Sequence, residues 1–393
     1  MSNKVDLQAR WRIYRPYVSA LLVFLASRLV VSLAVIFSAR LVPQNNESHV
    51  WNTGSSWLRY LLRFDAGWYL QISQQGYSYN GNDLIEQPVV FYPLYPLISR
   101  LLATLFGLEH YLALLIVSNL AILVAVPLLF KLVQKEYGEL TALYAVALLS
   151  FFPTALFFSV AYTESLAVLL IVSFFLLLKR ERFLLAALCA GLALATRSTG
   201  IALLAPLLWT IWRRFRTEPR RLIVYTIVCA GLATSGLCLF MLYLWSAFDS
   251  PLAFITAHRA WLATGRVGDY AYPVYLLLPF RFLGSIWQAG PNTLTLEPWF
   301  FFLFLALTLI FRKRLSTPYF LFALGVLLLP YFTFGGMLRM RAFTRYSMLA
   351  LPVFIIMADL LKGKYWLLLC ITALFAAMLF FYTAAYAQWY WAG

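Results

Sequence analysis

The sequence predicts an all-α polytopic membrane protein with about eleven transmembrane helices. Of its 393 residues, 63% are hydrophobic and only 12% are charged. Apolar runs of the length that a membrane-crossing helix needs, roughly 20 residues, recur along the whole chain. Basic residues gather in short clusters between these runs, as membrane topology requires. The formal net charge of +16 therefore has a topological explanation, and nucleic-acid binding is not expected.

Eleven apolar runs define the expected spans. They lie at residues 17–42, 111–133, 140–157, 163–178, 183–196, 199–212, 222–247, 297–311, 317–334, 345–361 and 365–388. The first run follows Lys4, Arg10, Arg12 and Arg15 and is not followed by a small-residue cleavage site. We therefore expect an uncleaved first helix, a cytoplasmic N-terminus and an extracytoplasmic C-terminus.

Residues 90–107 form the one ambiguous apolar segment. Counting them as a span would place the basic clusters "KRER" and "RRFRTEPRR" outside, against the positive-inside rule. Pro93, Pro96 and Arg100 also disfavour a lipid-exposed helix. We predict that this segment is a re-entrant or interfacial amphipathic helix on the outer face.

This topology leaves two long outer segments, at about 43–110 and 248–296, whereas the cytoplasmic connections have roughly ten residues or fewer. No separate soluble domain or internal repeat is visible, so residues 1–393 are predicted to form a single domain in the cytoplasmic membrane. Every lysine falls on the inner side, and the basic residues of the outer segments are arginines, whose planar fork suits phosphate oxygens. We expect the chemistry on the extracytoplasmic face.

Asp65 is the first candidate for that chemistry. It lies within "LRFDAGWYLQISQQGY", residues 62–77, which reads as an amphipathic helix at the outer interface. The apolar stripe of that helix comprises Leu58, Leu61, Leu62, Trp68, Tyr69 and Ile72. A partly desolvated carboxylate within such a stripe suits a general base. Alternatively, Asp65 is the N-cap of a helix that begins at Ala66.

Glu164 is a second acidic residue in apolar surroundings, at the outer start of a predicted span. A carboxylate at that position suits the positive end of the helix dipole, but charges inside membranes are often functional. Arg28 and Arg197 also fall in apolar runs. Both need polar partners, either in a functional site or in a structural pair.

Arginines that the topology does not require follow near the end of the chain. Arg339, Arg341 and Arg345 share the short outer loop "GGMLRMRAFTRY". Together with His258 and Arg259, they would neutralise a phosphate leaving group at the bilayer surface. The alternative is nonspecific binding of anionic lipid headgroups.

The sequence has no P-loop and no GxGxxG motif, so no nucleotide cofactor is expected. Its four cysteines lie in hydrophobic runs without a CxxC or Cys/His cluster, which argues against a disulfide framework or a structural zinc site. Asp83 and Glu86 are the acidic residues nearest to Asp65 and give weak support for a hard-cation site. We expect no metal.

Five segments, in chain order, resemble the PIG-V mannosyltransferase family, including its bacterial members, within the glycosyltransferase C (GT-C) superfamily. They are "FDAGWYLQISQQGY" at 64–77, "FYPLYPLISRLL" at 91–102, "FFPTALFFSVAYTESL" at 151–166, "ATRSTGI" at 195–201 and "TRYSMLALP" at 344–352. The resemblance implies a GT-C-type fold and a glycosyltransferase that moves a sugar, typically mannose, from a polyprenyl-phosphate donor to an extracytoplasmic acceptor.

In the family, an acidic residue of the first outer loop acts as the base, and the matching position here is Asp65. Phe64 stands where relatives commonly have tryptophan. Transfer by a single displacement would invert the anomeric centre. The candidate donor-phosphate ligands are Arg345, Arg341, Arg339, His258 and Arg259, and the candidate substrate-binding residues are Glu164, Trp68, Tyr69, Tyr92 and Arg197.

The expected partners are the polyprenyl-phosphate sugar, a lipid or glycan acceptor, and the bilayer. Three alternatives remain open: the same fold using another sugar such as glucose or arabinose, a lipid or sugar flippase or carrier, and a non-catalytic assembly subunit. A flippase or carrier would be expected to have charges midway along several spans, whereas the charges here lie near span ends, apart from Arg28.

Overall fold

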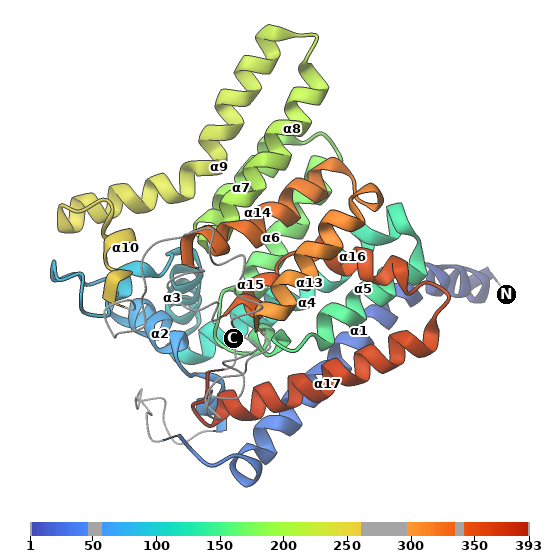
Figure 1. Cartoon of the computed structure of the whole chain (residues 1–393), viewed down its shortest axis with the longest axis horizontal. Coiled ribbons are helices and arrows are strands. Elements are labelled where there is room, and N and C mark those ends of the chain that lie inside the picture. Colours follow the sequence, from blue (N-terminus) through green and yellow to red (C-terminus); the bar gives the residue numbers. More distant parts are fainter. Residues whose placement is uncertain (1, 46–56, 261–296, 335–341, 392–393) are drawn as a thin grey trace.

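The computed structural model describes residues 2–45, 57–260, 297–334 and 342–391, and the regular secondary structure within these ranges is helical (Figure 1). The predicted all-α class is confirmed. The principal helices are α1 (Ser2–Leu41), α2 (Asp65–Gln75), α3 (Leu94–Phe106), α4 (His110–Tyr137), α5 (Glu139–Phe151), α6 (Glu164–Leu178), α7 (Phe183–Leu194), α8 (Leu204–Phe215), α9 (Pro219–Phe248), α10 (Ala253–Thr256), α13 (Glu297–Ile310), α14 (Thr317–Phe334), α15 (Phe343–Ser347), α16 (Leu351–Leu360) and α17 (Tyr365–Ala387). The 3₁₀ helices are η1 (Trp57–Leu61), η2 (Pro88–Val90), η3 (Ala155–Phe158), η4 (Ser198–Leu203) and η6 (Arg312–Arg314).

Four of the described helices are long and apolar enough to cross a membrane: the part of α1 from Tyr14 to Leu41, and all of α4, α9 and α17. The shortest, α17, has 23 residues, which at 1.5 Å per residue gives about 34 Å. This length exceeds the roughly 30 Å hydrocarbon core of a bilayer. The predicted polytopic class is therefore confirmed.

The other predicted apolar runs also coincide with helices, but these helices are shorter. For example, α5 has 13 residues and spans only about 20 Å. It ends at Phe151, just before Pro153, as expected because a proline disfavours helical geometry in the residue before it. Helices of this length reach only part of the way across a bilayer by themselves, so the count of eleven spans stays a prediction.

Arg28 of α1 binds polar groups at the end of α5 and in η3, which follows it. Its Nη1 donates to the carbonyl oxygen of Ala155 and to Oγ of Ser159, at 2.8 Å each, and its Nη2 donates to the carbonyl oxygen of Ser150 at 3.1 Å. A cation at the C-terminal end of a helix also suits the helix dipole. The polar partners expected for Arg28 are thus structural ones.

The first and last helices, α1 and α17, lie side by side in the lower part of Figure 1. Their ends are joined by hydrogen bonds, because Nε2 of Gln388 donates to Oγ of Ser38 at 2.9 Å, and the backbone N–H of Asn45 donates to the carbonyl of Gln388 at 3.0 Å. The helices therefore run in the same direction, as the predicted topology requires. The C-terminal end of the chain also contacts η1, at the start of the described part of the first outer segment.

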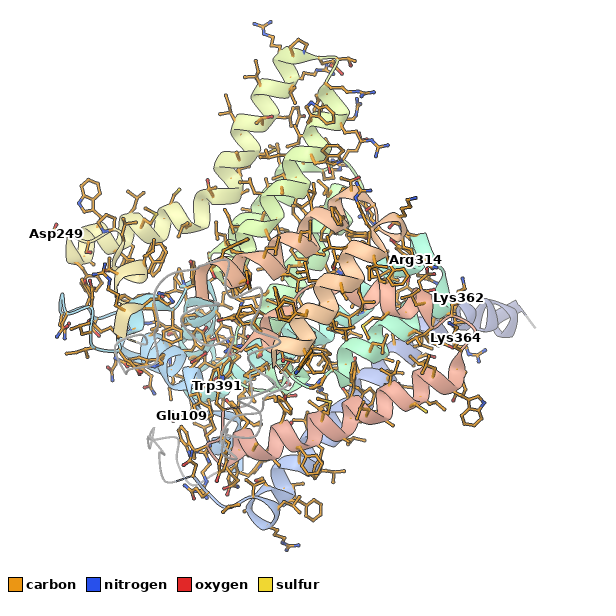
Figure 2. All side chains as sticks on the ribbon, viewed as in Figure 1. Glu109, Asp249, Arg314, Lys362, Lys364 and Trp391 are labelled. Atoms are coloured by element: carbon orange, nitrogen blue, oxygen red, sulfur yellow. The ribbon has the colours of Figure 1, made fainter. Side chains whose placement is uncertain are left out.

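The five charged residues that Figure 2 labels fall into two groups. Arg314, Lys362 and Lys364, which the topology assigns to the cytoplasmic side, lie together near the N-terminal end. Glu109 and Asp249, which it assigns to the outer side, lie away from them. This separation agrees with the predicted topology, while the direction in which each end faces stays a prediction.

Helix α3 forms within the segment that we predicted to be re-entrant or interfacial. Pro93 is its N-cap and Pro96 lies in its first turn, where a missing N–H costs no helical hydrogen bond. Its 13 residues span about 20 Å, too little to cross a bilayer alone. Its outer face exposes Leu97, Leu101 and Leu105. These features fit an interfacial helix better than a span.

Helices α7 and α9 approach each other through two glycines. A Cβ atom added to Gly236 would lie 2.2 Å from the carbonyl oxygen of Gly191, and one added to Gly191 would lie 2.3 Å from the carbonyl of Leu232. Small residues allow such close approach between membrane helices. Larger residues at these two positions would force the helices apart.

Candidate active site

The backbone bends immediately before Asp65. The 3₁₀ helix η1 ends at Leu61 and α2 begins at Asp65, so the continuous helix that we predicted from Leu58 is wrong. Phe64 is the N-cap of α2 and has a φ angle of 53°. Asp65 is the first helical residue rather than the cap, and the capping interpretation is also wrong. Asp65 therefore keeps helical spacing with Trp68, Tyr69 and Ile72, while the residues before the bend belong to a separate element.

The carboxylate of Asp65 forms an ion pair with Arg345. Its Oδ2 lies 3.0 Å from Nη1 of Arg345, across 280 positions of sequence. Arg345 belongs to the short helix α15 and its side chain is only 5% exposed, whereas the side chain of Asp65 is 23% exposed. One partner is therefore anchored in the protein interior, and the other reaches the accessible edge of the site.

Glu164 joins this pair to a second arginine. Its Oε1 accepts hydrogen bonds from Nε of Arg345 and from Nη1 of Arg197, and its side chain is fully buried. Nη1 of Arg197 also donates to Oγ1 of Thr163 at 2.9 Å. Glu164 does begin α6, as the helix-dipole interpretation expects. The two arginines show that it also holds the centre of a charged cluster.

We refer to Asp65, Glu164, Arg197 and Arg345 as the charged cluster. With all four side chains ionised, two positive charges balance two negative charges. A buried charge is tolerated when it is paired and hydrogen-bonded, and the guanidinium of Arg345 has a carboxylate on each side. The cluster brings together four residues that lie on four different segments of the sequence.

Two aromatic rings enclose the guanidinium of Arg345. Its Cζ lies 4.7 Å from the ring centre of Phe157 and 4.6 Å from that of Tyr162, distances at which cation–π attraction is effective. The hydroxyl of Tyr162 accepts from the backbone N–H of Asp65 at 3.2 Å and donates to the carbonyl of Arg63 at 3.1 Å. Tyr162 thus contacts both sides of the ion pair. We had not predicted a role for it, although it lies in the motif that contains Glu164.

The predicted substrate-binding aromatics fall into two groups. Tyr69 is buried, and its ring lies 6.3 Å from that of Tyr162, next to the charged cluster. Burial, with a smaller contribution from Asp65, raises the pKa of Tyr69, so its hydroxyl stays protonated at neutral pH. Trp68 stacks on Phe91 at 6.0 Å. Tyr92 contacts Phe240 of α9 and Phe254 of α10 instead.

His258 and Arg259 follow α10, which packs on η2. Nδ1 of His258 lies 2.6 Å from the carbonyl oxygen of Phe254. Burial lowers the pKa of His258, with the Phe254 contact acting in the opposite direction, so a neutral imidazole is favoured at neutral pH. Arg259 is exposed. Phosphate binding by these two residues stays a prediction, and Arg339 and Arg341 lie outside the described residues.

Several buried polar atoms near the charged cluster are not used by the described part of the protein. Within that part, Oε2 of Glu164 and the side-chain hydroxyls of Thr344 and Ser347 have no hydrogen-bond partner. Thr344 and Ser347 flank Arg345 on α15. Because buried polar groups are normally hydrogen-bonded, these atoms provide capacity for a polar ligand.

The described ranges contain no group of three His, Cys, Asp or Glu side chains arranged to hold a metal ion. Of the two acidic residues considered with Asp65, Asp83 accepts a hydrogen bond from the hydroxyl of Tyr79 at 2.9 Å. The four cysteines are free, and Cys229 is buried between helices.

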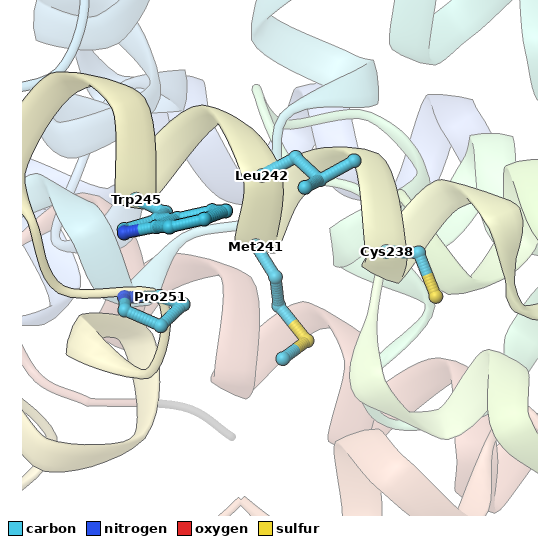
Figure 3. A pocket seen from close by; sticks show the side chains of 5 residues that line it. All are labelled: Cys238, Met241, Leu242, Trp245 and Pro251. Carbon is cyan, nitrogen blue, oxygen red and sulfur yellow. The ribbon is translucent and has the colours of Figure 1, made fainter.

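A separate apolar pocket of about 300 Å³ lies at the C-terminal part of α9 (Figure 3). Its lining consists of Cys238, Met241, Leu242, Trp245 and Pro251. None of these five residues is charged, so they offer no carboxylate or imidazole for acid–base chemistry. The charged cluster is the better candidate for a reaction centre.

A comparison with protein families gives a match to part of the chain. A family model described as dolichyl-phosphate-mannose-protein mannosyltransferase matches residues 86–246. This stretch is less than half of the chain and contains Glu164 and Arg197, while Asp65 and Arg345 lie outside it. A search of curated proteins gives no match.

The chain is also similar to solved structures of the Archaeoglobus fulgidus oligosaccharyltransferase. The complex with Zn and sulfate is 15% identical with a TM-score of 0.47, over 93% of this chain and 53% of that chain. The complex with an inhibitory peptide and a dolichol-phosphate is 14% identical with a TM-score of 0.45, over 92% of this chain and 55% of that chain. The chain thus spans about half the length of these structures.

Proposed function

We propose that this protein is a GT-C-type membrane glycosyltransferase of the PIG-V-like group, which transfers a sugar, mannose, from a polyprenyl-phosphate donor to a lipid or glycan acceptor. The reaction takes place on the extracytoplasmic face of the cytoplasmic membrane. The observation that carries the proposal is the ion pair between Asp65 and Arg345, which places a carboxylate base 3.0 Å from a guanidinium. The match of residues 86–246 to a mannosyltransferase family model supports the reaction class.

In this proposal, Asp65 is the general base. Its carboxylate takes the proton of an acceptor hydroxyl while that oxygen attacks the anomeric carbon of the donor. The bond between the anomeric carbon and the phosphate oxygen breaks, and the electron pair leaves with the phosphate. A single displacement inverts the configuration, so a β-linked donor gives an α-linked product.

Arg345 is the proposed ligand of the departing phosphate. A guanidinium presents several N–H donors in one plane and binds phosphate oxygens through charge-assisted hydrogen bonds. Nε of Arg345 is held by Glu164, so Nη1 and Nη2 are the nitrogens that can turn toward a donor. The unused polar atoms of Glu164, Thr344 and Ser347 support the presence of a polar ligand beside this arginine.

Binding of the donor would also change the state of the base. In the structure, Nη1 of Arg345 donates a hydrogen bond to Oδ2 of Asp65. A phosphate that takes over this N–H group would release the carboxylate to accept a proton from the acceptor. Proton removal is then favoured only when the leaving group is already in place.

The deciding experiment measures transfer of radiolabelled mannose from a short-chain polyprenyl-phosphate-mannose to extracted membrane lipids. We expect transfer by the purified protein and a loss of about 10²–10⁴-fold in Asp65→Asn, the range that general-base catalysis contributes. Asparagine keeps the size of the side chain and an oxygen for Arg345. Asp83→Asn is the matched control, since Asp83 lies in the same outer segment and bonds to Tyr79.

Equal transfer by Asp65→Asn and the parent protein would keep the enzyme and reject Asp65 as the base. Transfer only from glucosyl or arabinosyl donors would correct the sugar. Absence of transfer from all three donors, with acceptor lipids from several membranes, would contradict the proposed activity.

A further inference from the structure

The end of the chain packs against the bend that precedes Asp65. We call residues 386–391 the C-terminal aromatic segment. Tryptophans and tyrosines near the end of a membrane helix most often belong to an interfacial belt. However, Tyr386 is 1% exposed and Trp389 is 5% exposed, whereas Trp366 near the opposite end of α17 is 78% exposed. A belt residue keeps contact with the membrane interface, so burial of this kind calls for a different role.

At the bend, the backbone of Phe64 has a conformation that phenylalanine does not favour. Phe64 has φ 53° and ψ −122°, and a positive φ is unusual for a bulky side chain. Such conformations cost about 1–3 kcal/mol and persist only where the surrounding structure enforces them. Here the enforcing contacts are aromatic. The ring of Phe64 lies 5.7 Å from Tyr386, 5.4 Å from Trp389 and 5.1 Å from Trp391, between ring centres.

The same segment also binds the residue before Phe64. The hydroxyl of Tyr386 accepts from the backbone N–H of Arg63 at 3.1 Å and donates to its carbonyl at 3.0 Å. Nε of Arg63 donates to the carbonyl of Ala387 at 3.2 Å, and its guanidinium lies 4.5 Å from the ring centre of Trp389. Backbone, side-chain and ring contacts therefore all fix the position of Arg63, two residues before Asp65.

The other partner of the ion pair lies next to the same segment. Cζ of Arg345 is 6.0 Å from the ring centre of Trp391, which marks the end of the described chain in Figure 2. One short segment thus contacts the residues before Asp65 and also lies beside Arg345. The C-terminal aromatic segment acts on Asp65 indirectly, by contacting Arg63 and Phe64.

We infer that Tyr386 and Trp389 are positioning residues, which hold the Arg63–Phe64 bend so that the carboxylate of Asp65 faces Arg345. This inference rests on the proposed function, in which Asp65 is the base. A displacement of about 1 Å at a reacting group can cost 10²-fold in rate. A segment that begins 322 positions after Phe64 thereby becomes a requirement for efficient transfer.

The first arm of the test compares kinetic constants of Trp389→Ala, Trp389→Phe and Trp366→Ala. We expect Trp389→Ala to lose about 10²-fold in kcat, with the donor KM nearly unchanged, because the base and not the phosphate ligand is displaced. Phenylalanine retains a ring against Phe64 and should restore most of the rate. Trp366→Ala removes an exposed tryptophan from α17, the helix that precedes Trp389, and should behave like the parent protein.

The second arm does not depend on activity. Asp65→Cys is made in a chain whose four native cysteines are replaced, and the rate of its reaction with a membrane-impermeant thiol reagent is measured with and without Trp389→Ala. We expect the substitution at 389 to raise the rate severalfold, because the thiol is no longer held beside Arg345. Elution of each variant as a single species in detergent identifies the folded proteins.

An unchanged kcat in folded Trp389→Ala, or an unchanged thiol rate, would overturn the positioning role. A raised thiol rate in a protein that transfers no sugar would leave positioning in place and contradict the proposed function. A fall in kcat that Trp389→Phe does not restore, with no change in thiol rate, would indicate a general structural role instead.

Discussion

A double-mutant cycle between Glu164 and Arg345 tests whether the charged cluster is one energetically coupled unit. Glu164→Gln keeps the size of the side chain and an acceptor oxygen but removes the charge. Arg345→Met keeps an unbranched, apolar stem and removes the guanidinium. The cycle measures the free energy of unfolding of the parent, the two single variants and the double variant, and so isolates the coupling between the two side chains.

The structure sets the expected magnitude. Glu164 is fully buried and Arg345 is 5% exposed, and leaving one member of a buried ion pair without its partner costs about 3–5 kcal/mol. The double variant leaves neither of these two charges, while Arg197 keeps Thr163 and Asp65 is itself partly exposed. We therefore expect the double variant to cost less than the sum of the singles by about 1.5–3 kcal/mol, the contribution of a hydrogen bond to a charged group.

Unfolding in mixtures of detergent and SDS, followed by tryptophan fluorescence, provides the free energies. The control cycle uses Glu181→Gln and Arg214→Met, whose ion pair has an N–O distance of 3.0 Å but side chains that are 59% and 46% exposed. Exposed pairs contribute about 0.2–1 kcal/mol, so this coupling should be small. Additive effects at Glu164 and Arg345, equal to those of the control, would refute the view that these charges form one buried unit.

Two further predictions concern helix packing and topology. Gly236→Ala should destabilise the protein by about 1–3 kcal/mol, because the added methyl group overpacks against Gly191. Gly231→Ala on the same helix places its methyl group in open space and should not destabilise the protein. Equal unfolding midpoints of the two variants would contradict the close approach of α7 and α9. In a chain without its native cysteines, Asn80→Cys and Glu109→Cys should both react from outside with an impermeant thiol reagent, whereas Lys362→Cys should react only after the membrane is permeabilised. Reaction at only one of positions 80 and 109 would place a span between them.

Much of the helical framework could be predicted from the sequence because hydrophobic runs and basic clusters are local signals. Each apolar run that we predicted contains a helix, although the runs 199–212 and 345–361 are each divided between two helical elements, and the proline-containing segment 90–107 contains the short helix α3. The breaks within the framework were harder to see. The break between α5 and η3 is accommodated by Arg28, a residue more than 100 positions earlier that donates to the carbonyls of Ser150 in α5 and Ala155 in η3.

The charged cluster could be predicted only as separate residues. Asp65, Glu164 and Arg197 stood out as charges in apolar surroundings and Arg345 as an arginine that the topology does not require, but nothing in the sequence pairs Asp65 with Arg345. The continuous helix through residue 65 was wrong for a related reason, since helical periodicity alone does not reveal a positive φ at Phe64. That angle is stabilised by rings from the opposite end of the chain, which no local pattern can indicate.

The balance of charge in the cluster bears on how a donor would bind. Two arginines already neutralise two carboxylates, so an incoming phosphate adds negative charge to a site that has no surplus of positive charge among these four residues. Transfer of the proton from the acceptor would neutralise Asp65, while cleavage of the bond to the anomeric carbon would give the phosphate a second negative charge. One negative charge thus moves from Asp65 to the phosphate, the total charge of the site stays the same, and the guanidinium of Arg345 would then have Glu164 and the phosphate as its partners. The arrangement thus favours the charge distribution that follows proton transfer, which is the stage at which a glycosyltransferase needs stabilisation.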